Sequence, residues 1–163
     1  MNATSEKFLI VDDKAEFRKK IIEWLVELTR LELADILEAS DGKDALVKLE
    51  ASPQIKDILC DIAMKPMNGV AFAEAISDDG RGGILKEKEL NPTFWTSLIS
   101  KSIAKILNDD FNIGGDRYLK KPKKIEEFLE ILKKHFPHLL KKISFLFFPL
   151  LSSPTFLQSP ESF

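Results

Sequence analysis

The sequence Lys7-Phe8-Leu9-Ile10-Val11-Asp12-Asp13 combines a short, nearly continuous apolar run with two acids at its end. Such a run is typical of a β-strand that is covered on both faces, as in parallel sheets. Residues 15–28 then change to a helical pattern, because their apolar side chains recur at steps of three and four. A buried strand followed directly by an amphipathic helix predicts the start of an α/β domain.

The alternation of strand and helix continues along the chain. Further short apolar runs predict strands at 34–39, 57–60, 93–98 and 117–119, and helical patterns predict helices at 45–49, 70–76, 103–111 and 125–136. This order implies right-handed crossovers and a parallel sheet with helices on both faces. Residues 77–92 hold several glycines and charges and predict a long surface connection.

Length and composition exclude several classes of protein. The 163 residues carry 24 Lys+Arg and 26 Asp+Glu, a formal net charge of −2, so there is no basic surface that would predict nucleic-acid binding. The length predicts one domain with a tail. A single cysteine, Cys60, excludes an internal disulfide framework and suits a reducing compartment. The first residues have no apolar signal core, so we expect a cytoplasmic protein.

The C-terminal residues 137–163 form a tail of a different composition. Residues 143–151 are apolar and uncharged but too short for a membrane span, which needs roughly 20 apolar residues. Residues 152–163 are rich in Ser and Pro. We expect the tail to be poorly ordered; it could pack on the domain, dock on a partner or membrane surface, or be a chain end under little constraint. No chemistry is assigned to it.

Acids follow two of the predicted strands. Asp12 and Asp13 come after the first strand, and Asp61 comes after the third. The carboxyl ends of parallel strands meet at one edge of the sheet, where α/β proteins bind their ligands. Clustered carboxylates repel unless a cation neutralises them, and Mg²⁺ prefers oxygen ligands. An ordinary loop or helix-cap role explains any one of these acids but not the set, so we expect a magnesium site.

A lysine and a hydroxyl are predicted at the same edge. Lys121 closes the fifth strand, and a cis bond to Pro122 would aim its ammonium inward, whereas alternation points Lys120 the other way. Thr96 and Ser97 end the fourth strand, and only one of the two can face the cleft. An aspartate can be the nucleophile for a phosphoryl group, with Mg²⁺ and Lys neutralising the developing charge. The set therefore predicts phosphoryl transfer to a carboxylate.

The ordered motifs resemble the receiver domain of two-component response regulators, and most closely single-domain chemotaxis regulators. The matching pieces are residues 8–13 (FLIVDD), 41–46 (DGKDAL), 61–69 (DIAMKPMNG) and 118–122 (YLKKP). The resemblance covers residues 6–136, which we take as the domain. It implies a flavodoxin-like, doubly wound, five-stranded parallel sheet in the order 2-1-3-4-5 with helices on both faces.

The resemblance also implies roles for the residues of the acid cluster. Asp61 would be the phosphoacceptor, and Mg²⁺ would be held by Asp12, Asp13, the Asp61 side chain and the backbone carbonyl of Ala63. Lys121 would pair with the acceptor and then with the phosphoryl group.

Two further residues match the switch positions of the family. The hydroxyl residue of the family lies five residues after the proline that opens the fourth strand, so counting from Pro92 favours Ser97 over Thr96. Tyr118, three residues before Lys121, matches the aromatic whose rotation accompanies activation in many members. The chain departs from the family pattern at Lys65, where a proline is usual and where Pro66 follows instead.

The sequence thus predicts a phosphorylation-activated switch of a two-component phosphorelay. Asp61 would accept its phosphoryl group from a histidine kinase or a phosphotransfer protein, and output would pass to a downstream protein; we expect no turnover enzyme and no transmembrane segment. One alternative is a degenerate receiver that docks without phosphorylation, which the altered loop at Lys65 leaves open. A Mg²⁺-dependent aspartyl-phosphate phosphatase is a second, but Ala63 stands where such enzymes carry another acid. A dinucleotide-binding domain lacks its Gly-rich fingerprint here.

Overall fold

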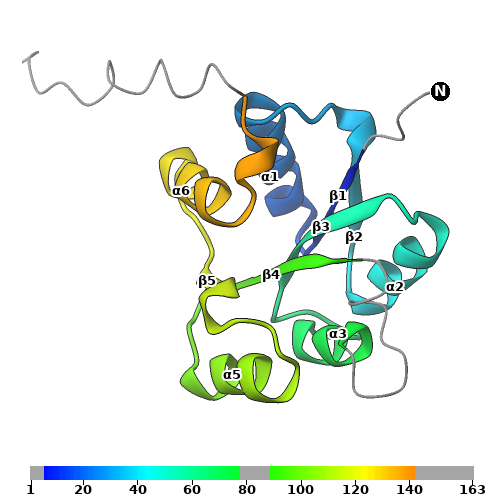
Figure 1. The fold of residues 1–163 in the computed structure, drawn as a ribbon, viewed down its shortest axis with the longest axis vertical. Coiled ribbons are helices and arrows are strands. Elements are labelled where there is room, and N and C mark those ends of the chain that lie inside the picture. The colour runs from blue at the N-terminus through cyan, green and yellow to red at the C-terminus, as the bar shows by residue number, and fades with distance from the viewer. Residues whose placement is uncertain (1–5, 78–88, 142–163) are drawn as a thin grey trace, which may run out of the picture.

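A computed structural model describes residues 6–77 and 89–141. Five parallel strands form one sheet in the order β2-β1-β3-β4-β5, with helices on both of its faces (Figure 1), as the sequence predicts. The strands are β1 (Lys7–Val11), β2 (Ile36–Ala39), β3 (Ile55–Asp61), β4 (Asn91–Thr96) and β5 (Tyr118–Lys120). The helices are α1 (Ala15–Leu28), α2 (Gly42–Ala51), α3 (Gly69–Ile76), α5 (Lys101–Lys105) and α6 (Ile125–His135).

The sheet separates two apolar cores. One core lies between the sheet and helices α1 and α6, and it includes Phe8, Ile10, Trp95 and Phe128. The other lies against α2, α3 and α5, and it includes Leu9 and Val11 among its members. Because successive side chains of a strand point to opposite faces, the apolar run of β1 supplies both cores. This is why the run is continuous rather than alternating.

The second half of the chain differs in detail from the sequence prediction. Strand β4 begins at Asn91, two residues earlier than predicted, because Asn91 pairs with Asp57 and Pro92 with Ile58 on β3. Both residues therefore belong to the sheet and not to the predicted connection at 77–92, of which residues 78–88 lie outside the described residues. The helix predicted at 103–111 begins at Lys101 and ends in a π-helical turn over Ile106–Asp110.

Residues 137–141, which the sequence analysis assigned to the tail, pack on the domain and are called the C-terminal strap. Leu139 is only 1% exposed, and its carbonyl accepts a hydrogen bond from the Arg30 amide at 2.9 Å. The Lys141 ammonium donates to the Val26 and Glu27 carbonyls near the end of α1, at 2.8 and 3.1 Å. The apolar stretch 143–151 lies outside the described residues. None of the described helices is long and apolar enough to cross a membrane.

Candidate functional site

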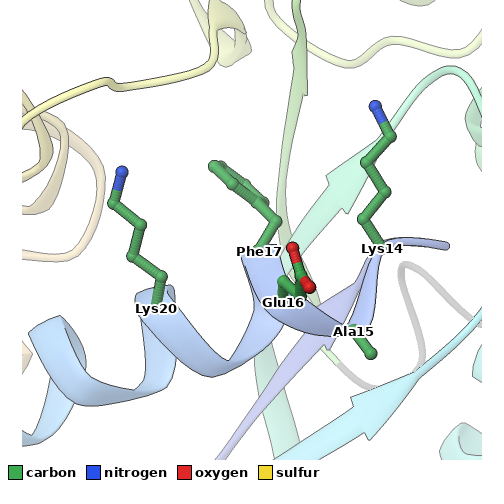
Figure 2. Close-up of a pocket in the computed structure, with 5 residues that line it drawn as sticks. All are labelled: Lys14, Ala15, Glu16, Phe17 and Lys20. Atoms are coloured by element: carbon green, nitrogen blue, oxygen red, sulfur yellow. The ribbon is translucent and has the colours of Figure 1, made fainter.

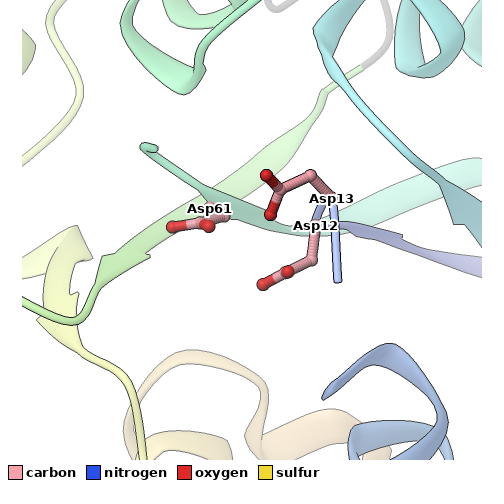
Figure 3. A group of neighbouring side chains, drawn as sticks. All are labelled: Asp12, Asp13 and Asp61. Carbon is pink, nitrogen blue, oxygen red and sulfur yellow. The ribbon is translucent and has the colours of Figure 1, made fainter. Parts of the chain in front are cut away.

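Three aspartates meet at the carboxyl edge of the sheet (Figure 3). Asp12 follows β1, Asp61 ends β3, and one oxygen from each of Asp12, Asp13 and Asp61 lies within 4.8 Å of the others. Asp12 and Asp61 are buried, whereas Asp13 is exposed. The neighbouring β1 and β3 bring these acids together because both strands end at this edge.

Lys121 joins the cluster from the end of β5. Its Nζ lies 2.5 Å from Oδ2 of Asp12 and 2.8 Å from Oδ2 of Asp61, and its side chain is 10% exposed. The Lys121 amide donates to the Thr96 carbonyl at 2.8 Å, which extends the pairing of β5 with β4 by one residue. The predicted cis bond to Pro122 is wrong: the cis peptide bond in the described residues joins Lys65 to Pro66. Strand pairing and alternation are sufficient to direct Lys121 toward the acids.

The electrostatics of the cluster favour a further cation. Burial raises the pKa of the Asp12 carboxyl, against the opposing effects of hydrogen bonds from Lys121 and the Lys14 amide. When the three carboxylates and the one ammonium are all charged, a formal charge of −2 remains. A divalent cation would compensate it, and carboxylate oxygens are suitable ligands for Mg²⁺.

The loop after β3 is held close to Asp61 by backbone contacts. Asp61 Oδ1 accepts a hydrogen bond from the Ala63 amide at 3.2 Å, and the Gly69 amide donates to the Ile62 carbonyl at 3.0 Å. A Cβ on Gly69 would lie 2.3 Å from the Asp61 carbonyl oxygen, so only glycine permits this approach. Lys65 lies in the same loop and is exposed.

The register of β4 separates the two candidate hydroxyl residues. Asp61 pairs with Trp95, so those two side chains share a face of the sheet and Thr96 points to the opposite face. Thr96 is buried, and its hydroxyl accepts from the Leu98 amide at 3.4 Å. Ser97 is exposed and follows the last residue of the strand. The alternation therefore favours Ser97 as the hydroxyl nearer the acids.

Tyr118 points to the opposite face of the sheet from Asp61, because it pairs with Phe94 whereas Asp61 pairs with Trp95. The residue is buried, and its hydroxyl accepts a hydrogen bond from the Ser100 amide at 3.2 Å and donates to the Leu98 carbonyl at 3.4 Å. Its ring thereby holds the loop between β4 and α5. The structure connects this tyrosine to the segment that follows Thr96 and Ser97, but not directly to Asp61.

Sequence reasoning missed two α1 residues beside the cluster. The Lys121 Nζ lies 4.6 Å from the centre of the Phe17 ring. The Arg18 guanidinium donates to the Asp12 carbonyl at 2.6 Å and pairs with Glu38 at 2.8 Å. Phe17 fits the apolar face of an amphipathic helix, so no sequence signal distinguishes it. Arg18 could have been suspected as a cation one helical turn after the acids.

A cavity of about 500 Å³ lies beside the start of α1 (Figure 2). Its lining residues are Lys14, Ala15, Glu16, Phe17 and Lys20. The side chains of Lys14, Phe17 and Lys20 extend from the same side of the helix start. Because Phe17 also contacts Lys121, this cavity adjoins the acid cluster.

Sequence comparison matches residues 8–133 to the model of the response regulator receiver domain. The protein-glutamate methylesterase/protein-glutamine glutaminase of Aliivibrio fischeri is 30% identical over 155 residues, covering 90% of this chain and 37% of that protein. Chemotaxis protein CheY1 of Helicobacter pylori is 36% identical over 75 residues, covering 46% of this chain and 58% of that protein. The chain therefore spans less than two thirds of either relative.

Solved structures share the fold. Chemotaxis protein CheY4 of Vibrio cholerae superposes with a TM-score of 0.62 at 24% identity, covering 82% of this chain and all of that chain (100%). A CheY-like receiver domain protein of Methanospirillum hungatei gives a TM-score of 0.62 at 21% identity, covering 83% of this chain and 96% of that chain.

Proposed function

Because this chain belongs to the response regulator receiver domain family, we propose that it is a two-component signalling switch that accepts a phosphoryl group on Asp61. The observation that carries the proposal is the position of Lys121, whose ammonium bridges Asp61 and Asp12 within a cluster of three carboxylates. A carboxylate nucleophile beside a buried cation at an open sheet edge is suited to phosphoryl transfer.

In the proposed reaction an Asp61 carboxylate oxygen attacks the phosphorus of a phosphohistidine. The P–N bond breaks as the P–O bond forms, and the imidazole leaves with the electron pair and gains a proton. Lys121 lies 2.8 Å from Asp61, close enough to transfer its interaction to a phosphoryl oxygen as charge moves there. Ser97 would donate a hydrogen bond to the same phosphoryl group. Tyr118 and residues 98–100, which are hydrogen-bonded to each other, would then change position.

Mg²⁺ is the metal that the acid cluster fits. Asp12, Asp13 and Asp61 offer oxygens within 4.8 Å of one another, and we propose that the Ala63 carbonyl completes the protein ligands. When bound, the metal would neutralise charge on the phosphoryl oxygens. Burial raises the pKa of the Asp12 carboxyl despite its contact with Lys121, so a bound cation would stabilise the charged carboxylate.

The proposed partners are a histidine kinase or phosphotransfer protein as donor and a downstream protein as target. A Helicobacter pylori relative is named a chemotaxis protein, so a chemotaxis-like relay is one setting for this switch. We propose a cytoplasmic location, which the free thiol of buried Cys60 suits. The chain would assist its own phosphorylation and dephosphorylation without being a turnover enzyme.

Intact-mass measurement after incubation with acetyl phosphate tests the proposal. We expect one phosphoryl adduct in the presence of Mg²⁺, no adduct in EDTA, and no adduct on Asp61→Asn. Asp116→Asn is the matched control, because Asp116 is an exposed acid that pairs weakly with Lys134 at 3.7 Å. A persistent adduct on Asp61→Asn would overturn the assignment of the acceptor.

Two further outcomes identify the alternatives. A folded chain that takes no phosphoryl group from acetyl phosphate or from a kinase would be a docking module instead. Steady hydrolysis of small phosphate esters would make it a phosphatase.

Comparing Ser97→Ala with Thr96→Val tests which hydroxyl contacts the phosphoryl group, because only loss of Ser97 is expected to slow phosphorylation.

A further inference from the structure

We propose that Phe17 is a positioning residue for Lys121, whose ammonium the Phe17 ring holds against Asp61 through a cation–π contact. This inference rests on the proposed function, because it assigns Phe17 a part in phosphoryl transfer to Asp61. It concerns a side chain of α1 that supplies no ligand and no nucleophile.

The contacts of the Lys121 ammonium leave it little freedom. Two carboxylates lie at 2.5 and 2.8 Å from Nζ, and the Phe17 ring centre lies at 4.6 Å. This distance is within the range of about 6 Å in which a cation is attracted to a ring face. The Lys121 side chain is only 10% exposed, so these contacts lie largely out of bulk water.

The Phe17 ring is itself held in place by the core. It packs edge-on against Trp95, with ring centres 5.2 Å apart and planes at 70°. Trp95 is fully buried and pairs in register with Asp61 across β3 and β4. Strand pairing thus fixes Trp95 beside Asp61, and Trp95 packs against the Phe17 ring that lies next to the Lys121 ammonium. Movement of the Phe17 ring would change the position of the ammonium relative to the acceptor.

If Phe17 only buried apolar surface of the core, an aromatic ring would not be required at this position. The helical pattern of α1 would accept leucine at position 17 equally well, because leucine is apolar and favours helices. The charged Nζ of Lys121, however, lies over the ring face, where only the electrostatics of an aromatic ring attract it. The contact thus distinguishes positioning of the ammonium from burial of an apolar side chain.

During transfer, Lys121 must exchange Asp61 for an oxygen of the incoming phosphoryl group. The Phe17 ring would limit the ammonium to the space between these two positions. Loss of the ring face should therefore slow the chemical step more than it weakens donor binding. A cation–π contact at a partly exposed site predicts a rate about two- to fivefold lower.

Fluorinated phenylalanines at position 17 test the electrostatics with little change of shape. We expect the phosphorylation rate at saturating acetyl phosphate to fall in the order phenylalanine, 4-fluoro-, 3,5-difluoro- and 3,4,5-trifluorophenylalanine, because fluorine withdraws charge from the ring face. Phe17→Leu should match the slowest member, and Phe17→Tyr should retain the rate. The same series at Phe128, which also packs against Trp95, is the matched control and should have no effect.

A second measurement does not depend on phosphorylation. The ε-methylene protons of Lys121 should show an upfield ring-current shift by NMR, kept in Phe17→Tyr and lost in Phe17→Leu. Absence of this shift in the wild type would overturn the inference, as would a phosphorylation rate that is constant across the fluorinated series. A ring-current shift in a protein that takes no phosphoryl group would overturn the proposed function while the Phe17–Lys121 contact stands.

Discussion

At the scale of single residues, Gly69 lies beside the acid cluster at a position with no room for a Cβ atom. Gly69 begins α3, and a Cβ there would lie 2.3 Å from the Asp61 carbonyl oxygen and 2.8 Å from Ile62 Cα. Both neighbours are backbone atoms of the segment that carries Asp61, so they cannot move away as a side chain could by changing rotamer. Gly42 begins α2 in a comparable way, but there the nearest atoms belong to the Met67 side chain, at 2.5 and 2.7 Å.

We therefore predict that Gly69→Ala destabilises the domain more than Gly42→Ala. Overpacking against fixed backbone costs typically about 1–3 kcal/mol, whereas the Met67 side chain can change rotamer at a smaller cost. Urea unfolding of the two variants measures the difference. Equal losses of unfolding free energy would show that the loop after β3 yields as readily as a side chain.

His135 is a buried titratable residue distant from the acid cluster. Its Nε2 has no hydrogen-bond partner among the described residues. Burial lowers the pKa of His135 below its usual 6.5, and the neighbouring charges of Arg117 and Lys134 lower it further. The folded chain therefore resists protonation of this imidazole more than the unfolded chain does.

This pKa shift predicts a loss of stability in mild acid. Above pH 6.5 the imidazole is neutral in both states and folding is unaffected; as the pH falls from 6.5 toward the lower folded pKa, the unfolded chain gains the proton first. His135→Phe should remove this contribution. The unfolding free energy of the variant, relative to that of the wild type, should therefore increase as the pH is lowered from 7.5 to 5.5. Urea unfolding at both pH values checks it. An unchanged difference between the two proteins would contradict the prediction.

At the scale of elements, the C-terminal strap connects α6 to the far end of α1. Thr29 and Leu140 form an isolated antiparallel bridge, and Lys141 places its ammonium on carbonyls at the negative end of the α1 dipole. His138 pairs with buried Asp57 at 2.8 Å. The strap thus closes the apolar core beneath α1 and α6, to which Leu139 belongs.

The strap is accordingly expected to contribute to the stability of the whole domain. Leu139→Ala should lower the unfolding free energy by about 2–5 kcal/mol, as for other buried leucines. Leu33→Ala is the matched control: Leu33 is 68% exposed, and its loss should change stability by less than about 0.5 kcal/mol. Thermal or urea unfolding separates the two. A small effect of Leu139→Ala would mean that the strap is dispensable for folding.

At the scale of the whole molecule, the sheet brings Asp12, Asp13, Asp61 and Lys121 together at its carboxyl edge. Three carboxylates with one ammonium are less stable together than with a bound cation, so metal binding and folding should be coupled. The free energy of metal binding adds to that of folding when the unfolded chain has no such site.

Mg²⁺ should therefore raise the midpoint of thermal unfolding. A concentration ten times the dissociation constant adds about 1.4 kcal/mol, or about 3–6 °C for a domain of this size. Asp13→Asn should abolish most of this increase, because it removes a proposed ligand whose side chain is exposed, whereas Asp116→Asn should retain it. An equal response of both variants to Mg²⁺ would place the metal elsewhere.

Much of this architecture could be predicted because the signals are local. The apolar run at 7–11 and the helical spacing at 15–28 each arise within one element, and both match the structure. The start of β4 was harder to predict from the sequence, because Asn91 and Pro92 are poor strand formers. Pairing with β3 overrides that preference. The sequence assigns residues 137–141 to a tail expected to be poorly ordered, because they have no periodicity that would indicate their packing on the domain.

The sequence by itself determined the fold class and the meeting of Asp12, Asp13 and Asp61, since alternating strands and helices dictate a parallel sheet and parallel strands end at one edge. Only the tertiary structure decided that Thr96 faces away from Asp61 and that Lys121 lies over Phe17. Lys121 and Asp12 are 109 residues apart in the chain, yet their side chains lie in contact. Such contacts depend on strand register and on how helices pack, and neither leaves a periodic pattern in the sequence.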